Sequence, residues 1–255
     1  MKVAIYQPDA RASDEDERLL RLAAHLGNAN GTDLVLCPEL FTSGYADADL
    51  VIARTHAAGG TMFDAVASLA NTHNTAIAYG YPEAGDDGKR YNSVMCVSAA
   101  GEQLANHRKR ALPSAYEKSL FELGDTPCVF TLGGRKVALL ICYEVEFPEA
   151  VRAAAIAGAE IVIAPTALGD AWGVVARQVV PTRAFENGVF LMYANFAGKE
   201  GDNTYLGESV IVSPMGVDLA RAGSGEALIS ATLDFGQIAP ARERLPYLQD
   251  YKRVQ

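Results

Sequence analysis

The chain has 255 residues, with 31 Asp and Glu against 22 Lys and Arg, so its formal net charge at pH 7 is −9. Of these residues 49% are hydrophobic and 21% are charged, a composition that is typical of globular proteins and excludes a disordered or collagen-like chain. An acidic chain without a basic stripe repels the phosphates of nucleic acids, so we expect no nucleic-acid partner.

Four cysteines, Cys37, Cys96, Cys128 and Cys142, lie far apart in apolar runs. No two of them have C-x-x-C spacing, so the sequence predicts neither a zinc site nor a thioredoxin-type redox pair. Isolated thiols are typical of a reducing compartment. The N-terminal segment does not resemble a signal peptide, and no apolar run reaches the length of a membrane span. We therefore predict a cytoplasmic protein with no metal, no cofactor and no membrane partner.

Strand-like and helix-like patterns follow one another along the chain. A strand is predicted over 3–7, and then a helix that Ser13 can cap, since an acidic first turn leads into a leucine-rich face that extends to Leu26. Further helices are predicted over 61–73, from Pro148 to Gly158, and over 173–186 with a break at Pro181. The remaining strands are predicted over 34–37, 76–81, 93–97, 136–142, 161–164, 189–194, 209–212 and 228–233.

Several of these strands are continuously apolar, a pattern typical of strands that are covered on both faces. Gly133-Gly134 predicts a hairpin between two of them. No linker or shift in composition divides the chain, so we expect one mixed α/β domain over 1–255, with its helices outside. The strands outnumber those that one twisted sheet holds comfortably, which favours two sheet layers.

The common catalytic motifs are absent from the sequence. It has no G-x-S-x-G elbow, no H-E-x-x-H, no P-loop and no complete G-x-G-x-x-G. The four histidines are scattered, without the spacing of metal ligands. A Ser-His-Asp or Cys-His site therefore has little support.

Three polar residues stand where apolar strands end. Glu39 follows a buried strand and Pro38, at the edge where α/β folds place their sites; the ordinary alternative is a turn carboxylate in solvent. Cys142 lies in a strand-to-helix turn, where helix N-terminal amides favour a thiolate; the alternative is an inert core thiol. Lys109 lies in a run of basic residues that could equally be a solvated face.

Taken together, three segments resemble the catalytic blocks of the carbon–nitrogen hydrolase (nitrilase) superfamily: Pro-Glu39-Leu-Phe, Arg-Lys109-Arg-x-Leu-Pro and Ile-Cys142-Tyr-Glu-x-Glu-Phe-Pro-Glu. The resemblance extends over nearly the whole chain and includes the segments around Glu83, Tyr91-Asn-Ser and Pro165. It implies a four-layer α-β-β-α sandwich. It also implies a homodimer or higher homo-oligomer, for which the helices after Pro148 and near Val174 to Val180 are candidate contacts.

The resemblance further implies a Glu39–Lys109–Cys142 triad with a second glutamate, for which Glu117 is the first candidate and Glu122 the second. Glu39 would act as the base, and Lys109 with the Tyr143 N–H would hold the oxyanion. Glu117 would orient Lys109 or the substrate amide; its ordinary alternative is an exposed helix residue.

Residues around the nucleophile indicate the branch of the family. Nitrilases usually have Trp after the cysteine, where this chain has Tyr143, and carbamoylases have more basic residues there. The resemblance is therefore to amidases, which cleave a primary amide to acid and ammonia through a cysteine thioester. Tyr143, Tyr45, Tyr116 and Trp172 are candidates for contacts with a small-molecule amide, although Trp172 could equally be a core residue. Nitrile or N-carbamoyl hydrolysis and a non-catalytic binding member are the alternatives.

Overall fold

The structure is a computed structural model that describes residues 1–11, 14–27, 29 and 31–254. Its first large sheet has seven strands in the order β15-β1-β2-β4-β5-β6, with β3 beside β4. β1, β2 and β4 run parallel, and β15, β5 and β6 run antiparallel to their neighbours. The strands are β1 (Lys2–Gln7), β2 (Leu34–Leu36), β3 (His56–Ala57), β4 (Ala76–Ala84), β5 (Arg90–Val97), β6 (Gln103–Arg108) and β15 (Ala227–Thr232).

The second sheet has six strands in the order β14-β13-β10-β9-β8-β7. Its strands are β7 (Cys128–Leu132), β8 (Arg135–Leu139), β9 (Ile161–Pro165), β10 (Phe190–Ala194), β13 (Val210–Val212) and β14 (Asp218–Arg221). The predicted hairpin is confirmed: Gly133 and Gly134, with φ of 56° and 76°, join β7 to β8, as a two-residue turn with both φ angles positive requires. A separate hairpin pairs β11 (Ala197–Glu200) with β12 (Asn203–Leu206).

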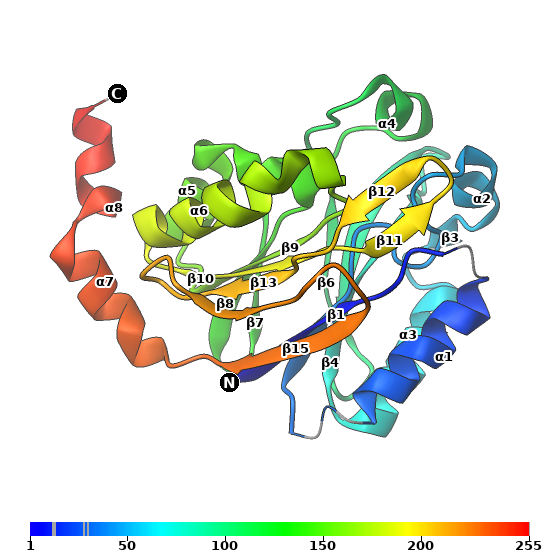
Figure 1. The fold of residues 1–255 in the computed structure, drawn as a ribbon, viewed down its shortest axis with the longest axis horizontal. Helices are drawn as coiled ribbons and strands as arrows, with labels where there is room; N and C mark the ends of the chain where they lie inside the picture. The colour runs from blue at the N-terminus through cyan, green and yellow to red at the C-terminus, as the bar shows by residue number, and fades with distance from the viewer. Residues whose placement is uncertain (12–13, 28, 30, 255) are drawn as a thin grey trace.

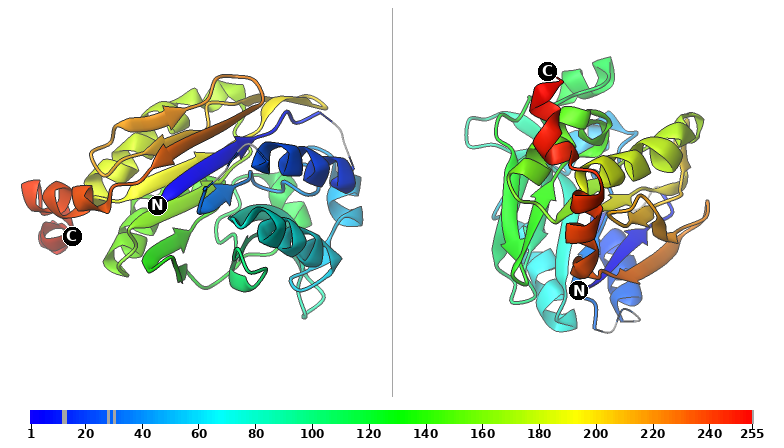
Figure 2. Two further views of the ribbon diagram at one scale, coloured as in Figure 1. Left: turned by 90° about the horizontal axis from the view of Figure 1, so that it is seen from below. Right: turned by 90° about the vertical axis from the view of Figure 1, so that its left-hand side faces the viewer.

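The two sheets face each other and helices cover their outer faces (Figures 1 and 2). Alternate side chains of β1 show why both faces are apolar: Val3 and Ile5 pack between the sheets, whereas Ala4 and Tyr6 pack under helices. α1 (Glu15–Leu26) and α3 (Thr61–His73) cover the first sheet. α5 (Pro148–Ile156) and α6 (Val180–Asn187) cover the second. The predicted α-β-β-α sandwich is confirmed.

Three of the predicted helices differ in detail. α5 ends at Ile156, two residues before the predicted end at Gly158. The N-cap of α1 is Asp14, whose carboxylate accepts a hydrogen bond from the Glu17 N–H at 2.8 Å, and Ser13 lies outside the described residues. The break expected at Pro181 is a change of helix type, in which a π-helical turn, η3 (Val175–Val179), continues into α6. Proline has no N–H to donate to the preceding turn, which is a physical reason for the change at that position.

The strand expected over 136–142 is three residues too long. β8 ends at Leu139, and Cys142 begins a 3₁₀ helix, η1 (Cys142–Glu146). Cys142 has a φ of 48°, which lies outside the β region. The chain therefore leaves the sheet before the cysteine, although the sequence remains apolar.

The other helices are short. They are α2 (Ala48–Ala53), α4 (Ala115–Leu120), η2 (Asp170–Trp172), η4 (Phe235–Gln237), α7 (Ile238–Arg244), α8 (Tyr247–Asp250) and η5 (Tyr251–Arg253). α7 and α8 extend along the end of the sandwich that carries α5 and α6 (Figure 1). Within the described ranges, no helix combines the length and apolar character needed to cross a membrane.

Candidate active site

Glu39 lies in the turn that follows β2. Its side chain is fully buried, so the interpretation as a solvent-exposed turn carboxylate is wrong. Oε1 accepts hydrogen bonds from Lys109 Nζ at 2.6 Å and Asn92 Nδ2 at 2.7 Å. Oε2 has no hydrogen-bond partner among the described residues. Since buried polar atoms are normally hydrogen-bonded, this oxygen is placed to take a proton from a group that enters the site.

The turn that carries Glu39 packs tightly against β4. A Cβ on Gly80 would lie 2.5 Å from both Leu40 N and Pro38 O, so only glycine permits this approach of the two backbones. The turn also reaches the second sheet, because Glu39 N–H donates to Thr166 O, just after β9, at 3.4 Å. The site is therefore built where the two sheets meet.

Lys109 is held between two carboxylates. It follows β6, its own N–H donates to Asn92 O at 2.8 Å, and its side chain is fully buried. Nζ donates to Glu39 at 2.6 Å and to Glu117 Oε2 at 2.8 Å. Glu117 is on α4, where Ser114 caps the helix by accepting from the Glu117 N–H at 3.1 Å. The interpretations of Lys109 as a solvated residue and of Glu117 as an exposed one are both wrong.

The charges in this cluster keep the lysine protonated. Burial alone would lower the pKa of Lys109, but the charges of Glu39, Cys142 and Glu117 raise it above its ordinary value. The pKa of Glu117 is raised by burial and by the charge of Glu39, with Lys109 acting in the opposite direction. One ammonium thus compensates two buried acids, so the cluster can hold an added proton on a carboxyl.

Cys142 shares a cavity with Glu117 and Tyr45. Thr166 Oγ1 lies 3.0 Å from its Sγ and 2.9 Å from the Tyr193 hydroxyl oxygen. Burial and the charge of Glu39 raise the pKa of the thiol, and the charge of Lys109 lowers it. The net direction favours the neutral thiol at rest. The thiol needs a base at the moment it reacts.

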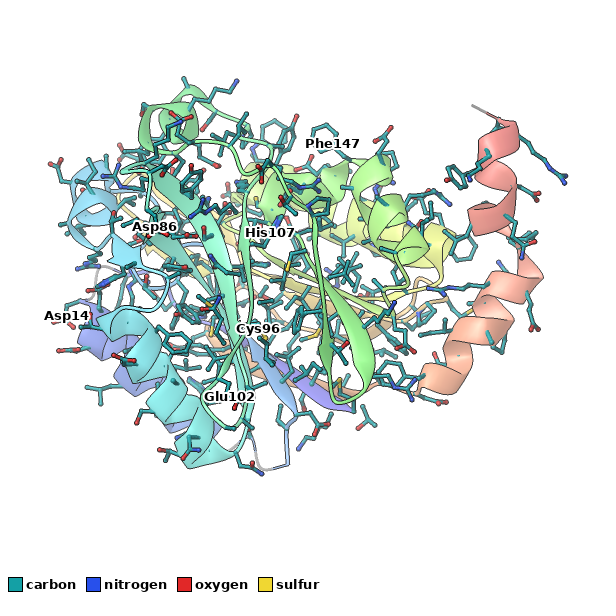
Figure 3. The ribbon with its side chains drawn as sticks, turned by 180° about the vertical axis from the view of Figure 1, so that it is seen from behind. Asp14, Asp86, Cys96, Glu102, His107 and Phe147 are labelled. Carbon is teal, nitrogen blue, oxygen red and sulfur yellow. The ribbon has the colours of Figure 1, made fainter. Side chains whose placement is uncertain are left out.

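Glu144 holds the turn around Cys142 in place. Its buried carboxylate accepts from Ile141 N–H at 2.8 Å, His107 Nε2 at 2.9 Å and Arg110 Nε at 3.0 Å. His107 lies in the interior among the side chains that surround β6 (Figure 3). Burial raises the pKa of Glu144, but the hydrogen bond and charge of His107 and the other donors lower it overall. This carboxylate therefore ties the residue before Cys142 to His107 and Arg110.

Glu144→Gln is expected to destabilise the protein by about 1.5–3 kcal/mol at pH 7, because a neutral amide replaces an anion that accepts several buried hydrogen bonds. A carboxyl with a lowered folded pKa contributes its full stability above the ordinary pKa of 4.5, and that stability is lost as the pH falls through the folded pKa. The difference between wild type and variant in urea unfolding should therefore shrink below pH 4.5. Glu149→Gln, an exposed change on α5, is the control, and an equal effect of both variants would contradict this role.

The cavity has a volume of about 640 Å³ and is open to solvent. Three of the predicted contact residues, Tyr45, Tyr143 and Trp172, line it. The Tyr45 hydroxyl donates to Glu117 Oε1 at 2.7 Å. Trp172 is 63% exposed, so it is a wall residue and not a core residue. Tyr116 lies in the adjoining cavity and supports Tyr45, donating from its hydroxyl to Tyr45 O at 2.6 Å.

The second candidate for the additional glutamate, Glu122, lies outside this cluster. Its side chain is 57% exposed and pairs with Lys89 at 3.8 Å. Sequence reasoning missed Asn92 and Thr166 as partners of Glu39 and Cys142. Thr166 directly follows the apolar strand β9, as Glu39 follows β2 after Pro38. The same search for polar residues at the ends of apolar strands could therefore have found it. Asn92 lies inside β5, in the Tyr91-Asn-Ser segment that resembles the family, but no strand end marks it as a partner of Glu39.

The comparisons with known proteins agree with this arrangement. A model of the carbon–nitrogen hydrolase family matches residues 2–243. A protein of Pseudomonas protegens described as a hydrolase in the pqqF 5′ region is 41% identical over 253 residues, covering 98% of this chain and 88% of that protein. An (R)-stereoselective amidase of a Pseudomonas species is 32% identical over 252 residues, covering 98% and 91%.

Solved structures of an amidase from Nesterenkonia sp. AN1 have the same fold. One has a TM-score of 0.82 at 34% identity and covers 98% of this chain and 96% of that chain. Another is the structure of a variant, with a TM-score of 0.83 at 33% identity, and it covers 98% of this chain and 93% of that chain. It shows covalent addition of the acetamide moiety of fluoroacetamide at the active-site cysteine of that amidase. By its match to the family and its identity to these relatives over nearly all of its length, this chain belongs to the carbon–nitrogen hydrolase family.

Proposed function

We propose that this enzyme hydrolyses a primary amide to a carboxylic acid and ammonia through a thioester on Cys142. The observation that supports this most strongly is the buried Lys109 ammonium between Glu39 and Glu117, within electrostatic reach of the Cys142 thiol. Amidases are among the relatives that resemble the chain over 98% of its length. The proposal assigns Glu39, Lys109 and Cys142 as the catalytic triad within one carbon–nitrogen hydrolase domain over 1–255.

The first half-reaction forms the thioester. Glu39 takes the proton of the Cys142 thiol as Sγ attacks the carbonyl carbon, so the S–C bond forms and the negative charge moves to the carbonyl oxygen. The unpartnered Oε2 is the basic atom. Protonated Glu39 then gives this proton to the amide nitrogen, the C–N bond breaks, and ammonia leaves.

The second half-reaction releases the acid. Glu39 takes a proton from a water molecule as its oxygen attacks the thioester carbon. The C–O bond forms, the S–C bond breaks, and Glu39 returns the proton to Cys142. The sum consumes one amide and one water and yields one acid and one ammonia, so the enzyme regains its starting state.

The Lys109 ammonium and the Tyr143 N–H are assigned as the hydrogen-bond donors to the oxyanion that forms on the substrate carbonyl. Lys109 stays cationic because its neighbours raise its pKa. Tyr143 is the second residue of η1, and the first N–H groups of a helix have no acceptor within it. Preorganised donors of this kind are typically worth about 3–4 kcal/mol each. Glu117, which binds Nζ through both carboxylate oxygens at 3.0 and 2.8 Å, would orient the lysine or the substrate amide.

An ammonia-release screen tests the substrate class. The purified full chain is given aliphatic amides, amino-acid amides, ω-amides, nitriles and N-carbamoyl amino acids. The proposal predicts the highest kcat/KM on a primary amide. A higher value on a nitrile or a carbamoyl compound would assign that reaction instead, and no turnover of any compound would favour a non-catalytic binding member.

Two further properties belong to the proposal. The homodimer is supported by the half-exposed Ile156 on α5 and Val174 beside η3, so Ile156→Asp should shift the molar mass measured by light scattering toward the monomer. An unchanged mass would exclude this face.

A cytoplasmic location is supported by the four free thiols, Cys37, Cys96, Cys128 and Cys142.

A further inference from the structure

The cavity that holds Cys142 is strongly acidic. Its lining includes Glu146, Asp170 and Asp202 in addition to Glu117, and its described lining residues include no Lys or Arg. An adjoining cavity of about 770 Å³ shares Asp202 with it, adds Asp47, and within the described part of the chain likewise has no basic lining residue. A hollow lined by one sign of charge focuses the field and attracts the opposite charge.

Glu146 differs from the other acids in the cavity. Glu117 is neutralised by Lys109, and Asp170 and Asp202 are exposed at the mouth. Glu146 is half-buried at the end of η1, four residues after the nucleophile. Its carboxylate has no hydrogen bond or ion pair with any described residue, whereas its backbone oxygen accepts a hydrogen bond from Arg183 Nη2 at 2.7 Å.

A half-buried carboxylate such as that of Glu146 is less stable in its charged form when no cation is paired with it. Burial raises the pKa of Glu146, with Lys109 and Arg183 acting in the opposite direction from a distance. A partly desolvated anion gains most from a cation that enters the same space. Neither of these cations is paired with the Glu146 carboxylate: Lys109 Nζ is bound to Glu39 and Glu117, and Arg183 Nη1 pairs with Glu186 at 3.0 Å. Since the described lining of the cavity contains no Lys or Arg, a cation that pairs with Glu146 inside it would have to come with the ligand.

The rest of the cavity suits the body of such a ligand. Ala167, Leu168, Ala171, Trp172 and Val175 provide an apolar wall, against which a short methylene chain can lie. A ligand with an amide at Cys142 and a positive end would thus meet a nucleophile, an apolar wall and an unpaired carboxylate in one cavity.

We propose that the enzyme selects amides whose acyl chain bears a protonated amine, and that Glu146 is the residue that binds this ammonium. The proposal rests on the amide hydrolysis proposed above and names its substrate class. Amides with a free carboxylate on the acyl chain are disfavoured for the same reason, since their charge would face Glu146, Asp170 and Asp202 without a free cation among the described lining residues.

Isosteric pairs test the proposal on the wild-type protein. Glycinamide, β-alaninamide and 4-aminobutanamide are compared at pH 7 with propanamide, butanamide and pentanamide, which have a methyl group in place of the ammonium. At the preferred chain length, kcat/KM should be about 10-fold or more higher for the amine, mainly through a lower KM. Succinamate and glutaramate should fall below the neutral amides. Equal or lower values for all three amines would overturn the proposal.

Glu146→Gln separates recognition from a general loss of activity. The ratio of kcat/KM between the amine and its methyl isostere should fall toward one in this variant. The matched control is Glu243→Gln, an exposed carboxylate on α7 outside both cavities, which should leave the ratio as in wild type. A ratio that stays high in Glu146→Gln would overturn the assignment of this residue.

The two proposals fail in different ways. If the neutral amides are hydrolysed and the amines are not preferred, only the substrate class is wrong. If no amide of either kind releases ammonia, the proposed function itself is wrong.

Discussion

Cys142→Ala is expected to reduce kcat for amide hydrolysis by at least about 10⁴-fold, because the reaction loses the atom that forms the thioester. Among the described lining residues, no other cysteine reaches the cavity. The free energy of unfolding should change by less than about 1 kcal/mol, since the side chain is small and only partly buried. Ammonia release from butanamide and urea unfolding measure the two quantities.

The control for this variant is Cys128→Ala. Cys128 is also partly buried, but it lies on β7, away from the cavity. It should retain wild-type turnover. Turnover that survives Cys142→Ala would contradict the assignment of the nucleophile.

Lys109→Met is expected to lower both stability and activity. It removes the only ammonium bonded to Glu39 and Glu117 among the described residues and leaves two buried carboxylates uncompensated. Breaking a buried ion pair in this way typically costs about 3–5 kcal/mol. Activity should fall by about 10³-fold or more, because the oxyanion loses its cation. Urea unfolding and kcat at pH 7 are the measurements.

The loss of stability in Lys109→Met should depend on pH. Burial raises the folded pKa of Glu117, and removing Lys109 removes the charge that opposes this shift. The folded variant therefore binds more protons than the unfolded chain as the pH falls, and it is stabilised. The stability deficit of Lys109→Met should therefore be smaller at pH 5 than at pH 7. The double variant Lys109→Met/Glu117→Gln should regain part of the stability and none of the activity. A Lys109→Met protein as stable as wild type at pH 7 would contradict the buried cluster.

The sequence identified the parts of the site that lie in local blocks. Glu39, Lys109 and Cys142 stand in motifs that resemble the family, and Glu117 follows Lys109 by eight residues, on α4. The strand count indicated two sheets. The order of strands was beyond the sequence, because pairings such as Lys2 with Thr232 join segments from opposite ends of the chain and no local pattern records them.

The partners of these residues could not be predicted for a related reason. Asn92 reaches Glu39 across 53 positions, and Thr166 reaches Cys142 across 24. The end of β8 was misjudged because the apolar sequence continues past Leu139, whereas the positive φ of Cys142 and the hydrogen bond from Ile141 N–H to Glu144 belong to a turn that the apolar pattern does not record. Glu146 was visible in the motif, but its unpaired state depends on the turn of η1 and on which neighbours reach it.

The most direct test is to detect the thioester itself. The wild-type enzyme is quenched with acid during turnover of butanamide, over a millisecond-to-second time course, and its peptides are mapped by mass spectrometry. The account predicts one butyryl group on the peptide that contains Cys142, and none on that peptide in Cys142→Ala. Turnover with the butyryl group on Cys37, Cys96 or Cys128, or on no cysteine at any time, would contradict it.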